Sequence, residues 1–198
     1  MNSLMTTLSP TATAMIRKDH AMVLGQFRKL EPDTSPQTRE ATIRTICHAL
    51  EIHAQVEEEL FYPAMREAGV DSPVLAKSQP EHDRMRELMQ PLTGNQLEGQ
   101  PEEQIRALDE LMNTVMHHMA DEETQLLPAA ERQCSKQELS ELGARMTQRK
   151  MALARPRAGE LAVDMARAAP TKSTVMAVAA LVTMAWLLGH RRHHRHWA

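Results

Sequence analysis

The sequence has few aromatic residues, few cysteines and no excess of positive charge. Aromatic residues make up only 3% of its 198 residues. Unbranched leucine and methionine are plentiful and lose little rotamer freedom in a helix, so the balance favours an all-α chain. The formal net charge of −3 argues against a nucleic-acid-binding domain, which usually carries a basic face. Cys47 and Cys134 lack CxxC spacing, which predicts free thiols in a reducing compartment.

Residues that start and stop helices divide the chain into five predicted helices. Ser-Pro pairs at residues 9–10, 35–36 and 72–73 are typical of a helix cap followed by a first helical residue. We expect Gly69 to stop the second helix, Pro63 to kink it, Pro80 to delay the start of the third to about Gln79, and Pro128 to kink or end the fourth. The predicted helical stretches are residues 10–31, 36–68, 73–92, 101–128 and 136–153, of which the third would become a regular helix near Gln79.

An internal repeat relates the second predicted helix to the fourth and the first to the third. A shift of 65 residues places HAQVEEELFYPA, which starts at His53, on HMADEETQLLPA, which starts at His118. A shift of 62 residues places Asp19-His20 on Glu81-His82. The order along the chain is therefore His, His-x-x-x-Glu, His, His-x-x-x-Glu, with one element on each helix.

The two His-x-x-x-Glu motifs lie on apolar helix faces, where residues four apart reach the same point. Burying a carboxylate there costs several kcal/mol unless it is paired or binds a cation, and no inward-facing lysine or arginine is evident. Histidine and glutamate suit iron, manganese or zinc, and six ligands are too many for one tetrahedral zinc. The pattern therefore predicts two bridged metal ions. The predicted ligands are His20, His53, Glu57, His82, His118 and Glu122.

Neighbouring residues are weaker candidates for the site. His117 is turned about 100° from His118 on the helix, and His117 with Asp121 is the alternative pair. Tyr62 receives no role because its repeat partner is Leu127. Solvated or supporting positions are predicted for Glu58, Glu59 and Glu123.

These motifs resemble those of the bacterial type of the hemerythrin-like family, also called the HHE cation-binding domain. The resemblance covers most of residues 10–153 and implies an up-down-up-down four-helix bundle, to which a fifth helix is added here. It implies two iron ions with an oxo or hydroxo bridge. By the same resemblance the four histidines named above are terminal ligands, and Glu57 and Glu122 are bridging carboxylates.

One position departs from oxygen-carrying hemerythrins, which have a second histidine four residues after the ligand of the third helix. Arg86 stands there, which leaves more open coordination, as in the bacterial branch that includes iron-centre repair proteins of the nitric oxide response. Those proteins carry a cysteine-containing N-terminal segment, whereas no cysteine precedes His20 here. We therefore expect a protein that binds or senses O2, NO or peroxide. The alternatives are an enzyme that reduces NO or breaks down peroxide, and a protein that repairs or handles iron centres.

The C-terminal part has a different composition. Residues 154–172 are predicted to be a linker with a short helical piece, and residues 1–9 and 190–198 a flexible N-terminus and a His/Arg-rich tail. Residues 173–189 carry no charge and would span roughly 25 Å as a helix, which predicts a transmembrane anchor; a buried or oligomerising apolar helix is the alternative. Because the first residues lack signal-peptide features, we expect the bundle to face the cytoplasm from the bacterial inner membrane. A soluble cytoplasmic protein is the alternative.

Overall fold

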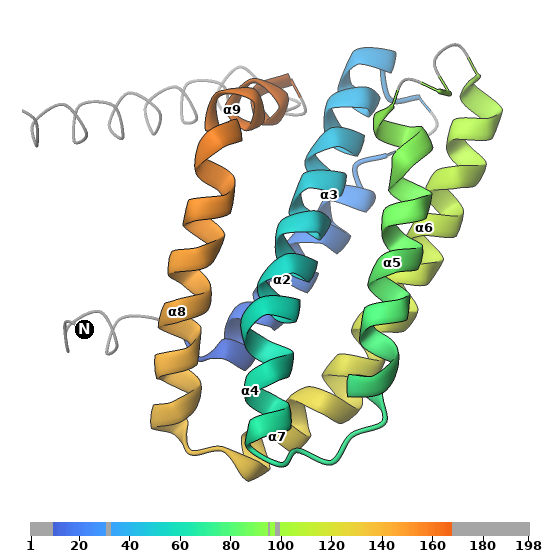
Figure 1. The fold of residues 1–198 in the computed structure, drawn as a ribbon. Helices are drawn as coiled ribbons and strands as arrows, with labels where there is room; N and C mark the ends of the chain where they lie inside the picture. The colour runs from blue at the N-terminus through green and yellow to red at the C-terminus, as the bar shows by residue number, and fades with distance from the viewer. Residues whose placement is uncertain (1–9, 31–32, 95, 98–99, 168–198) are drawn as a thin grey trace, which may run out of the picture.

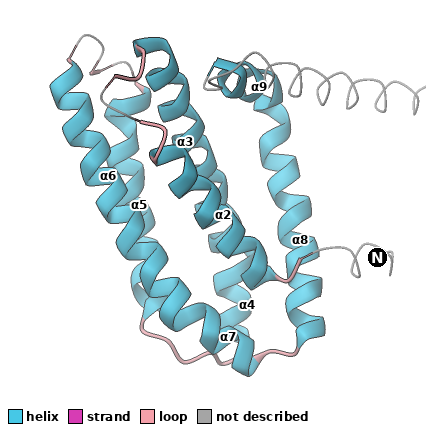
Figure 2. Ribbon diagram, turned by 180° about the vertical axis from the view of Figure 1, so that it is seen from behind, coloured by secondary structure: helices cyan, strands magenta, loops and turns pink. Residues whose placement is uncertain are grey.

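Four helices of a bundle lie side by side with neighbours antiparallel, and a fifth long helix stands against one side (Figure 1). The computed structural model describes residues 10–30, 33–94, 96–97 and 100–167, and every regular element within them is helical, as predicted. Figure 2 shows the same bundle from behind, with short loops joining its helices. The bundle helices are α2 (Ala12–Phe27), α3 (Pro36–Val56), α5 (Val74–Thr93) and α6 (Pro101–Asp121).

Two bundle helices continue beyond a short π-helical turn. The continuations are η1 (Glu57–Phe61) and α4 (Tyr62–Glu67) after α3, and η2 (Glu122–Leu126) and α7 (Leu127–Gln133) after α6. The backbone N–H that follows each π turn bonds to the carbonyl five residues back. Pro63 and Pro128 come next, and proline lacks the N–H that an α-helical bond would need. The helices therefore do not end at these prolines, and the irregularity lies in the turn before them.

Side-chain caps start three of the helices. Ser35 accepts a hydrogen bond from the backbone N–H three residues on, and Ser135 with Glu138 forms the capping box of the fifth helix, both as predicted. The first helix starts later than expected. Its cap is Thr11, whose hydroxyl accepts a backbone N–H at 3.3 Å, while the predicted cap Ser9 lies outside the described residues.

The third bundle helix starts at Val74, so the prediction that Pro80 delays it to about Gln79 is wrong. A proline removes one backbone hydrogen bond of a helix. Val74, Leu75 and Ser78 are nevertheless buried, and the Ser78 hydroxyl donates to the Val74 carbonyl at 2.7 Å. This packing holds the turns before Pro80 in the helix.

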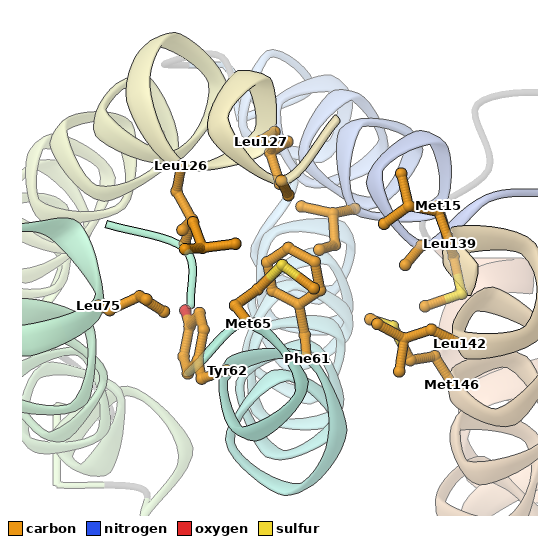
Figure 3. Close-up of a cluster of buried hydrophobic side chains, with 14 of the residues drawn as sticks. Met15, Phe61, Tyr62, Met65, Leu75, Leu126, Leu127, Leu139, Leu142 and Met146 are labelled. Atoms are coloured by element: carbon orange, nitrogen blue, oxygen red, sulfur yellow. The ribbon is translucent and has the colours of Figure 1, made fainter. Parts of the chain in front are cut away.

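The core consists of two apolar clusters, one at each end of the bundle. The Phe61 cluster (Figure 3) contains side chains from the π turns, α4 and the fifth helix. The Leu111 cluster fills the other end, between α2, α3, α5 and α6. It contains Cys47, where burial raises the pKa of the thiol to about 12, whereas Cys134 is half-buried. Neither cysteine forms a disulfide, as predicted.

The fifth helix, α8 (Lys136–Ala154), packs mainly against α2, α3 and η1. Figure 3 shows Met15 of α2 facing three side chains of α8, which are Leu139, Leu142 and Met146. The approach is closest at Gly143. A Cβ atom there would overlap the Pro10 carbonyl oxygen and lie 2.8 Å from the Ala12 nitrogen. Only glycine therefore allows α8 to lie this close to the start of α2.

The segment predicted to be a linker contains η3 (Arg155–Arg157) and α9 (Ala158–Arg167). Arg44 of α3 donates two hydrogen bonds to Asp164 of α9, at 3.1 and 2.8 Å. The predicted N-terminal segment, the anchor at 173–189 and the tail lie outside the described residues. Among the residues that are described, no helix combines the length and the apolar character needed to cross a membrane.

Candidate metal centre

The six predicted ligands meet inside the bundle, between the Phe61 and Leu111 clusters. Three come from the first half-unit (residues 12–67) and three from the second (residues 74–133). All six are buried, and the two glutamates have no exposed surface. They are His20 on α2, His53 on α3, Glu57 in η1, His82 on α5, His118 on α6 and Glu122 in η2.

The histidines form two pairs, one in each half-unit. The ring centres of His20 and His53 lie 5.0 Å apart, and those of His82 and His118 lie 4.6 Å apart. The Nε2 atoms of His82 and His118 are separated by 3.1 Å. Two nitrogens bound to one metal ion at about 2.1 Å lie roughly 3 Å apart. These two atoms are therefore spaced like ligands of a common ion.

Each glutamate lies between the two histidine pairs. Glu57 Oε2 is 3.3 Å from His53 Nε2 in its own half-unit and 3.5 Å from His82 Nε2 in the other. Glu122 Oε2 is 3.3 Å from His20 Nε2 and 3.6 Å from the Nε2 of the histidine in its own motif. A carboxylate in such a place can bridge two ions, one held by each pair.

The donor atoms fall into two groups, within each of which all ligand atoms lie within 4.8 Å of one another. Glu57 belongs to both groups, which is the arrangement that two bridged metal ions require. The groups are His20, His53, Glu57 and Glu122, and Glu57, His82 and His118.

Several of these buried donor atoms have no hydrogen-bond partner. A polar atom buried in this way costs about 1–3 kcal/mol, and a charged one costs more. His20 Nε2 and Glu122 Oε2 are 3.3 Å apart, but they are not aligned as a hydrogen bond. A metal ion would satisfy all of them, so the residues present fit a metal pair. The candidate metal-ligand atoms without a hydrogen-bond partner are His20 Nε2, His53 Nε2, Glu57 Oε1 and Glu122 Oε2.

Every ligand histidine also has a carboxylate beside its other ring nitrogen. An Nδ1–H that donates to a carboxylate leaves Nε2 unprotonated, which is the tautomer a metal ion needs. Two of these contacts lie within a half-unit, and the repeat relates them to each other. The other two join the half-units, and the repeat relates them to each other as well. The pairs are His20 with Glu123 (2.8 Å), His53 with Asp19 (3.8 Å), His82 with Glu58 (2.8 Å) and His118 with Glu81 (2.9 Å).

The buried environment keeps two of the histidines neutral. Burial lowers the pKa of His53, and burial together with the neighbouring His118 lowers the pKa of His82 to about 3. Both therefore offer a free nitrogen at neutral pH, as metal binding requires. His20 differs, since burial lowers its pKa but Glu122 and Glu123 outweigh burial and raise it.

The two glutamates shift in opposite directions. Burial and the charge of Glu122 raise the pKa of Glu57 well above its usual range. Burial also opposes ionisation of Glu122, but the contact with His20 and the nearby histidine charges lower its pKa to about 2. Two buried carboxylates this close do not both ionise without a cation. Without a cation, the pair therefore favours a proton on Glu57 over one on Glu122, and a bound metal ion would displace it.

Tyr62 is a site residue that the sequence interpretation missed. Its hydroxyl lies 3.0 Å from Glu57 Oε2, 2.8 Å from Glu122 Oε1 and 3.4 Å from His82 Nε2. It has one proton, so it donates to one carboxylate at a time. Burial and the two carboxylate charges raise its pKa well above the usual range. The only sequence signal was a lone tyrosine beside the motif, at a position that the repeat fills with Leu127.

The weaker candidates lie around the site. His117 is exposed and belongs to neither group, and its alternative partner Asp121 forms an ion pair with Lys77. Glu59 pairs with Arg149 of α8 at 2.6 and 2.9 Å. Supporting contacts to ligand histidines are made by Glu58 and Glu123.

Comparison with known proteins agrees with this geometry. A family model described as the hemerythrin HHE cation-binding domain matches residues 11–130, and a second, overlapping match covers residues 79–193. The first match spans more than half of the chain and includes all six predicted ligands. No curated protein and no solved structure matches the chain. The chain belongs to the hemerythrin HHE cation-binding family.

Proposed function

We propose that this protein holds two iron ions, joined by an oxo or hydroxo bridge, and binds or senses O2, NO or peroxide at an open coordination position. The observation that carries the proposal is the convergence of four histidines and two carboxylates on one buried space, with four donor atoms left unpartnered. Histidine pairs with shared carboxylates resemble the donor sets of non-haem iron sites that keep open positions.

Different residues of the chain would bind the ions and exclude water from such a site. His20 with His53, and His82 with His118, would hold one ion each, while Glu57 and Glu122 lie between the two pairs. Bound iron would supply a redox-active centre with room for the small molecule. The Phe61 and Leu111 clusters keep bulk water out of this space, whereas a small neutral molecule enters an apolar interior readily.

Iron content tests the centre itself. The purified protein should contain about two iron ions per chain, as carboxylate bundles do. A Glu57→Ala/Glu122→Ala variant should lose them. Glu59→Ala is the matched control, because Glu59 lies on the same turn but pairs with Arg149. Full iron content in the double variant would show that these residues are not the ligands.

Absorption spectra identify the small molecule. Adding O2, NO or hydrogen peroxide to the reduced, iron-loaded protein should change the spectrum for the molecule that binds and leave it unchanged for the others. A spectrum that responds to none of the three would contradict a binding or sensing role.

An enzyme that reduces NO or breaks down peroxide is the second candidate, and Tyr62 is the observation that favours it. Reduction of NO to N2O consumes protons and electrons, the electrons coming from reduced iron, and breakdown of peroxide moves protons between its oxygen atoms. The Tyr62 hydroxyl lies between Glu57 and Glu122 and therefore places an O–H group beside the space where the small molecule would bind. Turnover that falls in Tyr62→Phe while iron content stays unchanged would support an enzyme. Binding spectra without turnover would support a sensor.

Attachment of the protein to the bacterial inner membrane is a separate proposal, with residues 173–189 as the anchor and the bundle facing the cytoplasm. It rests on the apolar sequence of that segment alone. Membrane fractionation of the full chain, and of a chain that ends before residue 173, tests it. The full chain should sediment with membranes and the shorter one should not. A full chain found only in the supernatant would refute the anchor.

A further inference from the structure

Arg86 lies on α5, one turn after the ligand His82, and its side chain turns away from the metal space. Its Nη1 and Nη2 atoms contact the two oxygens of Glu58, at 2.9 and 3.0 Å. Its Nε atom reaches Glu51 at 3.3 Å, and Asp83 accepts a further hydrogen bond at 3.1 Å. The planar guanidinium therefore holds Glu58 from both oxygens, which a single point charge does not do.

Glu58 is the carboxylate that contacts Nδ1 of His82. The distance is 2.8 Å, and the same oxygen, Oε1, also contacts Arg86. The Glu58 side chain is 19% exposed, so without a second partner it can rotate into solvent. Arg86, Glu58 and His82 form one chain of contacts that ends at the metal space.

Of the four carboxylates that contact ligand histidines, only Glu58 is held at both oxygens by an arginine among the described residues. Asp19 and Glu81 contact lysines, Lys150 and Lys77. Glu123, which the repeat matches to Glu58, is 42% exposed and has no lysine or arginine within ion-pair distance among the described residues. The repeat partner of Arg86 is Leu24, an apolar residue. The second half-unit therefore has a restraint behind His82 that the first lacks behind His20.

We propose that Arg86 is a positioning residue of the metal centre, which keeps Glu58 on His82 and thereby fixes the ring orientation and tautomer of that ligand. The inference rests on the two-ion centre proposed above. Partners that orient a metal-bound histidine contribute about 10–100-fold to metal affinity. Arg86 acts through such a partner and should contribute part of that factor.

The direction of the effect separates positioning from charge. Removing a positive charge near a metal ion would by itself strengthen metal binding. Loss of positioning weakens it. Arg86→Gln removes the charge and shows whether metal affinity rises or falls. Arg86→Lys keeps the charge but cannot contact both oxygens of Glu58. A positioning role predicts weaker metal binding in both variants. A surface arginine on the same helix, Arg84, pairs with Glu87 and Glu110, and Arg84→Gln is the matched control.

The experiment is an anaerobic Fe²⁺ titration of the metal-free protein against a competing chelator. Glu58→Gln should weaken the binding of one of the two ions by about 10–100-fold, and Arg86→Gln by about 3–10-fold. Arg86→Lys should fall between Arg86→Gln and the unchanged protein, and Arg84→Gln should have no effect. In a Glu58→Gln background, Arg86→Gln should add almost nothing, because it acts through Glu58.

Other outcomes separate this inference from the proposed function. An unchanged protein that fails to bind two Fe²⁺ ions would overturn the two-ion centre and this role with it. Two ions bound with unchanged or stronger affinity in Arg86→Gln would overturn the positioning role alone. So would a loss of thermal stability that is equal with and without metal, since a structural link between α3 and α5 gives that result. Circular dichroism confirms that each variant is folded before titration.

Discussion

The two half-units present the same kinds of residue to the metal centre and different residues elsewhere. Each supplies a histidine pair, a glutamate at the start of a π turn and carboxylates that contact histidine Nδ1 atoms. Beyond that set they diverge. The fifth helix packs mainly on the first half-unit, Tyr62 stands where the second has Leu127, and Arg86 stands where the first has Leu24.

The difference shows which positions the centre needs twice. The repeat is strict at the histidines, the glutamates and the π turns, as the two ions proposed above would require of their ligand sets. The remaining inward positions need only bury apolar surface, which many side chains do equally well. The unrepeated residues are therefore the places where the two ion sites differ in their surroundings.

The largest expected effect comes from breaking one half-unit at a time. His53→Ala and His118→Ala each remove one member of a histidine pair. We expect iron content to fall from about two ions per chain to about one in either variant, because in the proposed centre each pair would hold its own ion. Metal analysis of the purified variants measures this.

His117→Ala is the control for this comparison, because His117 is adjacent to His118 but exposed. It should keep both ions. Iron loss in His117→Ala with full iron in His118→Ala would restore the alternative pair of His117 with Asp121.

The two glutamates should respond oppositely to neutralisation when no metal is bound. The folded-state pKa of Glu57 lies above its ordinary value of 4.5, so its ionisation favours unfolding as pH rises above 4.5. Glu57→Gln should therefore stabilise the metal-free protein, and the gain should grow as pH rises above 4.5. The pKa of Glu122 is lowered from 4.5 to about 2, so its charge stabilises the fold above pH 4.5, and this stability is lost as pH falls toward 2.

Glu122→Gln should thus cost about 3 kcal/mol of metal-free stability near pH 5, and the cost should shrink toward pH 8 as the histidines that lower the pKa of Glu122 lose their charge. Urea unfolding of the two variants over that pH range measures both effects. With iron bound, both substitutions should weaken the protein, since each removes a ligand charge. If both substitutions changed the metal-free stability in the same direction, the two glutamates would not have oppositely shifted pKa values.

The packing of α8 on the first half-unit gives the next largest expected effect, a loss of stability. Gly143→Ala places a Cβ against the backbone at Pro10 and Ala12, which should lower the free energy of unfolding by up to about 3 kcal/mol. Gly25→Ala is the matched control, since a Cβ there meets nothing within 4 Å and alanine favours a helix. Thermal unfolding measures both. An unchanged midpoint for Gly143→Ala would mean that α8 does not dock as closely as described.

Most of the fold and all six candidate ligands were readable from the sequence, because caps and repeated motifs are local signals. Ser35, Gly69 and Ser135 mark helix ends where the structure has them. Contacts that cross between helices were not readable. Nothing in the spacing shows that Glu58 contacts a histidine on α5, or that Arg86 turns toward that glutamate.

Tyr62 was missed for a geometric reason. In an α-helix, a residue five positions after Glu57 lies about 140° around the axis and faces away from it. The structure instead has a π turn between the two, which holds more residues per turn and brings position five back to the same side. The alignment of Tyr62 with Leu127 in the repeat suggested that both positions only bury apolar surface. Both residues are buried, but Tyr62 also carries a hydroxyl.

Tyr62→Phe sharpens the comparison at its smallest expected effect. The ring still fills its place in the Phe61 cluster (Figure 3), so the change removes only the hydrogen bond to Glu57 or Glu122. In the metal-free protein this should cost about 2 kcal/mol, the usual contribution of a hydrogen bond to a charged group. In the iron-loaded protein the carboxylates have metal partners, so the cost should be smaller. Urea unfolding with and without iron compares the two. An equal cost in both would contradict the expectation that iron competes with Tyr62 for the carboxylates, and no cost in either would show that Tyr62 contributes packing alone and leaves the half-units equivalent at this position.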